Sequence, residues 1–131
     1  MDYPLLKSTS KVERKNELKR MQADVNARSS ISLSECMVIL NELLFEDSYD
    51  TCRELSFRIA ATLLMLLNRD DTREAIPYCF GKVYANITQR KDETEAVRVY
   101  IASLLSFILH YGDTDFLLSK IDVVLHCLFS L

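Results

Sequence analysis

The sequence predicts an all-α fold on the strength of three observations, and an internal repeat of 41 residues extends the prediction to a fragment of an α-solenoid. Only 2 Gly and 2 Pro occur among the 131 residues, so the chain is poor in the residues that turns and strand connections use. Apolar residues recur at helical spacing in runs of helical length. Before these runs, a Ser, Thr or Asp repeatedly stands three residues ahead of a Glu, the pattern of an N-terminal capping box.

The apolar runs predict five core helices, which follow a basic N-terminal helix. The core helices are expected over residues 33–45, 55–67, 76–87, 96–109 and 116–131. Capping boxes are expected at Ser10 with Glu13, Ser32 with Glu35, Thr51 with Glu54, Asp71 with Glu74 and Asp92 with Glu95, and a plain cap at Asp113.

Pro77 predicts a break before the third core helix. Proline lacks a backbone N–H, and its ring clashes with the preceding helical turn. We therefore expect a short turn over residues 71–75 and a new helix that carries Pro77 in its first turn, where the missing donor does no harm.

The formal charge of −3 is unevenly distributed and suggests two parts. Residues 1–30, the basic head, carry seven Lys or Arg against four Asp or Glu, whereas residues 31–131, the helical-repeat domain, carry nine against fifteen. The head either caps the first repeat or is an arm that docks on an acidic protein or nucleic acid. Its candidate contact residues are Lys7, Lys11, Arg14, Lys15, Lys19 and Arg20. The acidic remainder repels phosphate and disfavours nucleic-acid binding outside the head.

A shift of 41 residues superposes two segments of the chain and predicts an internal repeat. The shift places Leu63 on Leu104 and Val83 on Val124, and apolar positions match throughout the two segments. The alternative is that any two amphipathic helices align at some offset.

Residues 33–131 resemble armadillo repeats, and HEAT repeats fit almost as well. The resemblance rests on the Ile76-Pro77 pair that opens one helix, on Ala60-Ala61 and Leu64, and on Ile101-Ala102 with Leu105 in the long helices. It implies stacked helix pairs that bind a peptide or partner protein along a groove of long helices. The implied groove residues are Arg58, Thr62, Leu66, Arg69, Val99, Ser103, Phe107 and His110. For Leu66 and Phe107, a place in the core is the alternative.

A narrower resemblance is to the nuclear-import adaptors of the armadillo family, the importin-alpha-like proteins. These carry a Trp and an Asn on each groove helix, where this chain has Thr62 and Leu66 in one unit and Ser103 and Phe107 in the next. The chain has no Trp at all. The basic head is similar in character to the autoinhibitory segment of those adaptors.

The last predicted helix carries apolar residues on more than one face. These are Phe116, Leu117, Leu118, Ile121, Val123, Val124, Leu125, Leu128, Phe129 and Leu131. A terminal solenoid helix normally has a polar outer face. We therefore expect that a longer solenoid, a second copy or another subunit covers this end, or that the first helices fold back over it.

Enzyme classes that depend on glycine-rich loops are excluded, because Gly81 and Gly112 are 31 residues apart. No cofactor or metal is expected, since Cys36, Cys52, Cys79 and Cys127 form no CxxC pair. Free buried thiols are favoured over a zinc site or disulfides, although a metal or thiol centre at Cys79, His126 and Cys127 stays open. No uncharged apolar stretch approaches the roughly 20 residues of a membrane span. The N-terminus lacks the apolar run of a signal peptide.

These features predict a non-catalytic protein-interaction scaffold or adaptor in the cytoplasm or nucleus, with another protein as its partner. The first alternative is an obligate subunit or homodimer assembled through the apolar C-terminal helix. The second is an importin-alpha-like transport adaptor.

Overall fold

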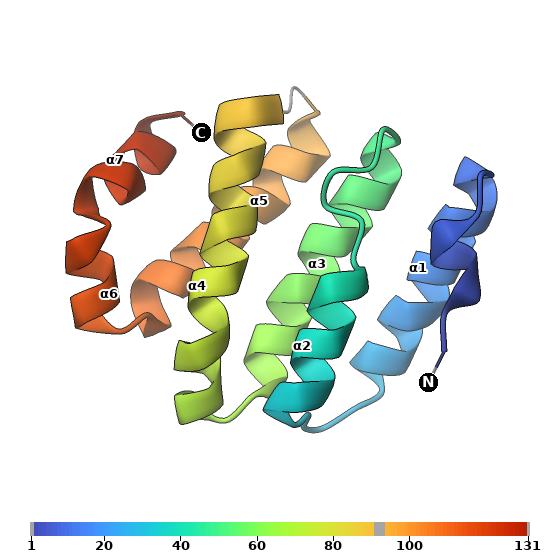
Figure 1. The fold of residues 1–131 in the computed structure, drawn as a ribbon, viewed down its shortest axis with the longest axis horizontal. Coiled ribbons are helices and arrows are strands. Elements are labelled where there is room, and N and C mark those ends of the chain that lie inside the picture. The colour runs from blue at the N-terminus through green and yellow to red at the C-terminus, as the bar shows by residue number, and fades with distance from the viewer. Residues whose placement is uncertain (1, 91–93, 131) are drawn as a thin grey trace.

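A computed structural model describes residues 2–90 and 94–130, and in these ranges the chain forms seven α-helices and no strand (Figure 1). The α-helices are α1 (Lys11–Asn26), α2 (Leu33–Glu42), α3 (Asp50–Leu66), α4 (Arg69–Ala85), α5 (Glu95–Tyr111), α6 (Thr114–Ser119) and α7 (Ile121–Ser130). A short 3₁₀ helix, η1 (Pro4–Lys7), precedes α1, and a π-helical turn, η2 (Asn86–Arg90), continues α4.

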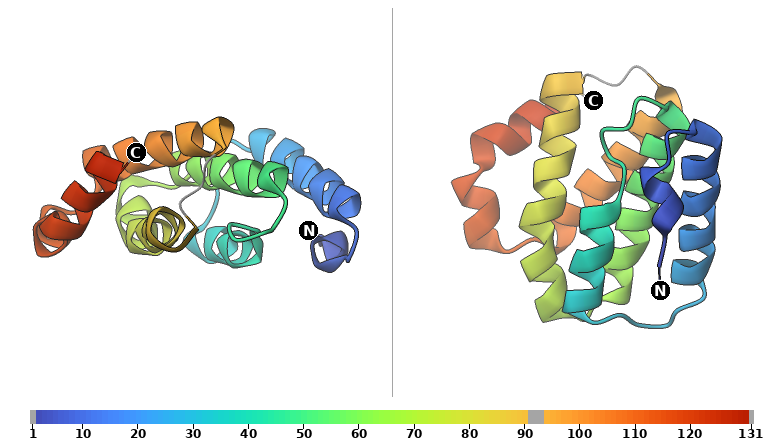
Figure 2. Two further views of the ribbon diagram at one scale, coloured as in Figure 1. Left: turned by 90° about the horizontal axis from the view of Figure 1, so that it is seen from above. Right: turned by 45° about the vertical axis from the view of Figure 1, so that its right-hand side comes forward.

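The helices form two layers (Figure 2). One layer contains α1, α3 and α5 side by side, and the other contains η1, α2 and α4, followed by α6 and α7. The chain alternates between the layers, so that each long helix of the first layer is followed by an element of the second. The predicted all-α solenoid fragment is confirmed by this arrangement.

The core lies between the layers, and α3 is at its centre. Phe57, Ile59 and Leu63 of α3 are fully buried, as are Leu18 of α1 and Leu104 of α5. Positions 41 residues apart share this core: Leu63 and Leu104 are both buried, and so are Val83 and Val124. The match ends near the C-terminus, where Ile87 is buried but Leu128 is 44% exposed.

Three of the predicted residues cap their helices, although the box at Ser10 is half formed, because the Ser10 N–H donates to the Ser8 hydroxyl and not to Glu13. The Ser10 hydroxyl accepts a hydrogen bond from the N–H of Glu13, and the Ser32 hydroxyl accepts one from the N–H of Glu35. Asp113 caps α6 by accepting from the N–H of Asp115. Each bond satisfies a backbone donor that the first helical turn would otherwise leave unpaired.

Two predicted caps are wrong, and one lies outside the described residues. Helix α3 begins at Asp50, and its N-cap residue Tyr49 makes no side-chain cap, so Thr51 is already inside the helix. Helix α4 is capped by Asn68, which accepts from the N–H of Asp71. Because Asn68, three residues before Asp71, already caps the helix, Asp71 lies inside the first turn. Asp92 is not among the described residues.

The predicted break at Pro77 is wrong, because α4 runs without interruption from Arg69 to Ala85. Pro77 is exposed, so its ring lies on the solvent side of the helix, whereas Ile76, Cys79 and Phe80 on the other side are buried. Burial of this face stabilises the helix and offsets the hydrogen bond that proline cannot donate.

The predicted last helix is divided into α6 and α7. The division is at Lys120, whose backbone angles of φ −115° and ψ 18° are not helical. The first helices do not fold back over this end: η1 and α1 lie at the opposite end of the molecule from α6 and α7 (Figure 1).

Candidate functional site

The eight residues predicted to line a groove all lie outside the buried core. Arg58, Thr62, Leu66 and Phe107 are partly buried, and Arg69, Val99, Ser103 and His110 are exposed. Seven of them belong to α3 and α5, which pack against each other, and Arg69 is the first residue of α4. Leu66 and Phe107 pack against the core, which agrees with the alternative prediction of a place in the core for these two side chains.

The structure brings three of these residues together around one hollow, the α3–α5 hollow, which has a volume of about 720 Å³. Arg69, Phe107 and His110 line it together with Leu64, Met65, Leu67, Thr72 and Tyr111. The hollow therefore lies where α3 and α5 end and α4 begins. Arg58, Thr62, Leu66, Val99 and Ser103 are outside its lining.

Aromatic side chains form one wall of the α3–α5 hollow. The rings of Phe107 and Tyr111 lie 4.5 Å apart between centroids, and His110 meets Tyr111 edge to face at the same distance. Arg69 adds a cationic group, and Met65, 70% exposed, adds a flexible apolar one. An aromatic wall beside a guanidinium is suited to a partner that carries apolar and acidic groups.

Sequence reasoning missed Met65 and Tyr111 in this lining. Each lies one helical turn after a predicted site residue of the same helix, since Met65 follows Thr62 by three residues in α3 and Tyr111 follows Phe107 by four in α5. Residues three or four apart share a helix face. The helical spacing could therefore have identified both.

Arg58 and Thr62, two predicted groove residues outside the hollow, make contacts within the protein. The guanidinium of Arg58 lies 4.9 Å from the centre of the Tyr100 ring, which connects α3 to α5. Arg58 also approaches Glu54 at 3.8 Å, and Thr62 donates a hydrogen bond to the Arg58 carbonyl. These contacts give Arg58 a packing role between the two helices.

The basic head uses three of its six predicted contact residues for internal packing. Arg14 forms an ion pair with Asp47 at 2.7 Å, and Arg20 pairs with Glu17 at 2.6 Å. Lys11 lies 5.1 Å from the centre of the Tyr49 ring. Lys7 and Lys19 are exposed, and Lys15 is partly buried. That residues 1–30 form a separate part of the chain stays a prediction.

All four cysteines are buried with free thiols. Burial raises the pKa of Cys36 and of Cys52 to about 11 and that of Cys79 to about 12, so these thiols are protonated at neutral pH. Across residues 2–90 and 94–130, no three His, Cys, Asp or Glu side chains are grouped so as to hold a metal ion. The proposed centre does not form, because His126 is exposed whereas Cys79 and Cys127 are buried.

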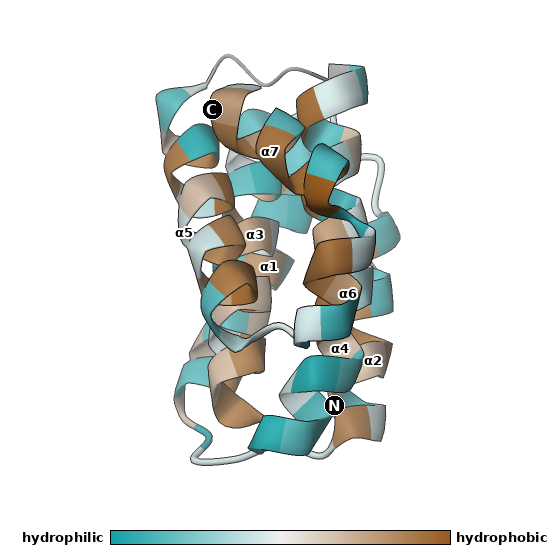
Figure 3. Cartoon of the chain, turned by 90° about the vertical axis from the view of Figure 1, so that its left-hand side faces the viewer, coloured by the Kyte–Doolittle hydropathy of each residue, from teal (hydrophilic) through white to brown (hydrophobic). Residues whose placement is uncertain are grey.

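The C-terminal helices α6 and α7 carry many apolar residues (Figure 3), and several of them are exposed to solvent. Leu118 is 64% exposed and Phe129 is 88% exposed, and Ile121, Leu125 and Leu128 are exposed to a smaller degree. Val124 is the only one of the ten predicted apolar residues that the described chain buries. Leu131 lies outside the described residues. We refer to Leu118, Ile121, Leu125, Leu128 and Phe129 as the C-terminal apolar surface.

The comparisons with known proteins agree with an interaction module. Residues 5–128 match the model of a family described as Dynein axonemal assembly factor 5-like, TPR repeats. No curated protein and no solved structure matches the chain. The described part of the chain contains no helix with the length and apolar character needed to cross a membrane.

Proposed function

Because the chain belongs to the Dynein axonemal assembly factor 5-like family of TPR repeats, we propose that it is a non-catalytic scaffold that binds a component of axonemal dynein during assembly. Stacked helical repeats present extended surfaces to partner proteins. The class of partner is taken from the family's description, and the α3–α5 hollow is the binding site that we propose for this partner.

The observation that carries this proposal is the grouping of Arg69, Phe107 and His110 around the α3–α5 hollow. Their side chains come from different helices and leave about 720 Å³ accessible from outside. Hydrophobic anchors beside an Arg are enriched at the centres of protein interfaces. We expect a partner segment with an apolar side chain next to an acidic one to occupy this hollow.

The length of the repeat supports an armadillo/HEAT-like geometry within this helical-repeat family. Core positions of α3 and α4 recur 41 residues later. Armadillo and HEAT units have about 40–47 residues, whereas TPR units have about 34. The importin-alpha-like function stays a prediction without such support, because the chain lacks Trp.

A location in the cytoplasm or nucleus also stays a proposal. It is supported by the four free, buried thiols, since disulfides are rare in compartments that keep thiols reduced.

The test compares two charge reversals. Arg69→Glu places a carboxylate at the α3–α5 hollow, whereas the matched control Arg73→Glu changes an exposed Arg of the same helix outside it. Dynein chains that co-purify with the tagged protein from ciliated cells are quantified by mass spectrometry. We expect Arg69→Glu to reduce their recovery about tenfold, equivalent to 1.4 kcal/mol, and Arg73→Glu to behave as wild type. Equal recovery with both variants, or no dynein chain with the wild type, would contradict the proposal.

A second candidate function is that of a subunit assembled through the C-terminal apolar surface, and the exposure of Leu118 and Phe129 favours it. Removing apolar area from water stabilises an association by about 25 cal/mol per Å². Light scattering of the purified chain tests self-assembly through this surface. A dimer that dissociates on Phe129→Lys supports self-assembly, and a strict monomer at micromolar concentration excludes self-assembly.

A further inference from the structure

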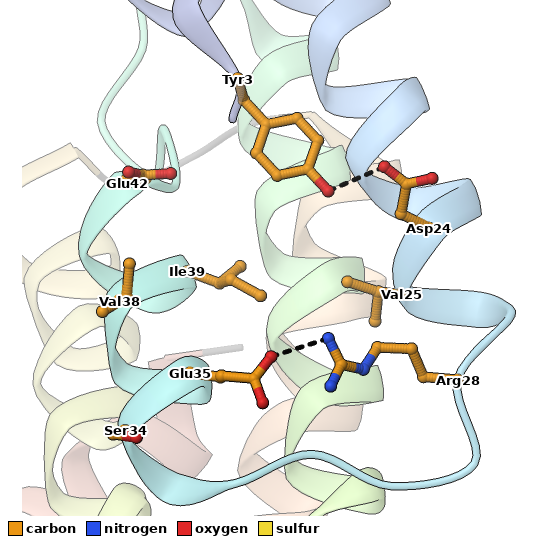
Figure 4. Close-up of a pocket in the computed structure, with 9 residues that line it drawn as sticks. All are labelled: Tyr3, Asp24, Val25, Arg28, Ser34, Glu35, Val38, Ile39 and Glu42. Carbon is orange, nitrogen blue, oxygen red and sulfur yellow. Dashed lines mark hydrogen bonds and ion pairs between the residues drawn. The ribbon is translucent and has the colours of Figure 1, made fainter. Parts of the chain in front are cut away.

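A second hollow, the α1–α2 hollow, lies at the N-terminal end of the molecule (Figure 4). It has a volume of about 240 Å³ and is lined by residues of α1 and α2, by Arg28 from the segment between them, and by Tyr3, which precedes η1. Val25 of α1 and Ile39 of α2 lie on opposite sides of it, and Val38 of α2 is 58% exposed at its edge.

Two polar contacts hold the ends of the α1–α2 hollow. The hydroxyl of Tyr3 donates a hydrogen bond of 2.8 Å to the carboxylate of Asp24. Arg28, which lies just beyond the end of α1, forms an ion pair of 2.9 Å with Glu35 of α2 (Figure 4). The apolar side chains lie between these contacts, so the hollow is preformed by α1 and α2 and has a defined length.

The charged residues of the lining are mostly acidic. Asp24, Glu35 and Glu42 outnumber one cation, Arg28, which gives the lining a formal charge of −2 at neutral pH. Glu42 is exposed at the end of α2, two helical turns from Glu35. A partner that brings a cation close to its apolar anchor is therefore favoured over an acidic one.

The position of the hollow in the fold indicates what shape of segment it accepts. In the layer that contains α2 and α4, the place beside α2 is taken by η1, which has only four residues (Figure 2). On α2, Glu35, Val38 and Glu42 are spaced by three and four residues and thus form one ridge along the helix. A short helix can lie along such a ridge, continuing the layer.

We propose that the α1–α2 hollow is a docking site for a short amphipathic helix of a partner protein. One bulky apolar side chain of that helix, such as Leu or Phe, enters between Val25 and Ile39. A Lys or Arg one turn away lies beside Glu42. The volume fits this anchor, since an apolar cavity of about 150 Å³ accommodates benzene. This site is distinct from the α3–α5 hollow and goes beyond the proposed function.

A peptide titration of the full chain tests the docking site. The probe is a helical peptide of about 15 residues, built from Ala and Lys with one central Leu. Two companions replace the Leu by Ala, or every Lys by Glu. Addition of the probe to ¹⁵N-labelled protein should shift amide signals of residues 24–28 and 34–42, and both companions should bind about tenfold more weakly. No shift at millimolar probe, shifts confined to α5, α6 or α7, or equal binding of the three peptides would overturn the proposal.

Matched variants assign the binding to this hollow. Val38→Arg and Glu42→Lys change exposed residues of the lining and should each weaken the probe about tenfold. Val12→Arg, on a residue of α1 that is 50% exposed and outside the hollow, should leave the affinity unchanged. Equal affinities of Val38→Arg and wild type would contradict the site. Such a result would leave the comparison of Arg69→Glu with Arg73→Glu unaffected, so the two proposals fail separately.

Discussion

Asp47 connects three parts of the chain through one carboxylate and one carbonyl. Its two carboxylate oxygens accept hydrogen bonds of 2.7 and 3.1 Å from Arg14 of α1, and one of them also accepts from the N–H of Tyr49. The Asp47 carbonyl accepts a further bond from Arg53 of α3. The Asp47 side chain is only 8% exposed and that of Arg14 15% exposed, so this bidentate pair is poorly screened by solvent.

The pKa of Asp47 lies below its ordinary value. Burial by itself would raise this pKa, but hydrogen bonds from Arg14 and Tyr49, with the charges of Arg14 and Arg53, lower it further than burial raises it. A carboxyl whose pKa is lowered in the folded state stabilises the fold. This stabilisation is fully present above the unfolded pKa of about 3.9. This contribution disappears as the pH falls through the folded pKa.

Replacement of Asp47 by Asn is therefore expected to alter stability in a pH-dependent way. At pH 7 the Asp47→Asn variant should melt on the order of 5 °C below the wild type, because the charge of Arg14 loses its partner. Between pH 5 and pH 2.5 the gap should narrow, since the wild type loses the same interaction by protonation. Thermal unfolding followed by circular dichroism measures both. Glu74→Gln, on an exposed residue of α4, is the control. A difference in melting temperature between Asp47→Asn and the wild type that stays constant down to pH 2.5 would contradict the role of the Asp47 carboxylate.

Helix α4 forms although its intrinsic helix propensity is poor. It contains Pro77 and Gly81 in its interior, two residues that disfavour helices. Its buried residues, among them Ala75, Cys79 and Val83, recur on one face and hold it in the second layer. Tertiary burial thus outweighs local preference along this helix.

The two glycines of the chain should respond in opposite ways to alanine. A Cβ added at Gly81 meets nothing within 4 Å, so Gly81→Ala should raise the free energy of unfolding by about 1 kcal/mol through better helix propensity. At Gly112 a Cβ would approach the carbonyl oxygen of Ile108 to 2.6 Å, and Gly112→Ala should lower stability. Urea denaturation of both variants provides the measurement. A loss of stability in Gly81→Ala would contradict this expectation.

At the scale of the whole molecule, the basic head shares its core with the repeats. Leu18 and Met21 of α1 are fully buried, and Val25 is 2% exposed. Helix α1 packs against α3 of the repeats (Figure 1). η1 is bound to the same helix, since Glu17 accepts a hydrogen bond from the N–H of Leu5.

A core truncation in α1 should therefore destabilise the entire chain. Met21→Ala is expected to lower the free energy of unfolding by about 3 kcal/mol in one cooperative transition, because it opens a cavity beside α3. Lys19→Ala, an exposed change in the same helix, should cost less than about 0.5 kcal/mol. Chemical denaturation followed by far-UV circular dichroism distinguishes them. A separate early transition in Met21→Ala would instead support residues 1–30 as an independent part.

The fold class and the helices were predictable because they depend on local patterns. Apolar spacing located α2, α3, α5 and most of α4, and side-chain caps at Ser10, Ser32 and Asp113 follow from neighbours three residues or fewer away. Of the eight predicted groove residues, Arg69, Phe107 and His110 line one hollow, whereas Met65 and Tyr111 of the same lining were not predicted.

Apolar periodicity and helix-capping residues were sufficient to predict an all-α chain of repeated units, because both act between residues a few positions apart. The continuity of α4 through Pro77, the Arg14–Asp47 pair and the α1–α2 hollow depend on contacts between elements that lie far apart along the chain. Burial, charge neutralisation and the shape of a hollow arise only when the layers pack, and no pattern within a single helix contains them.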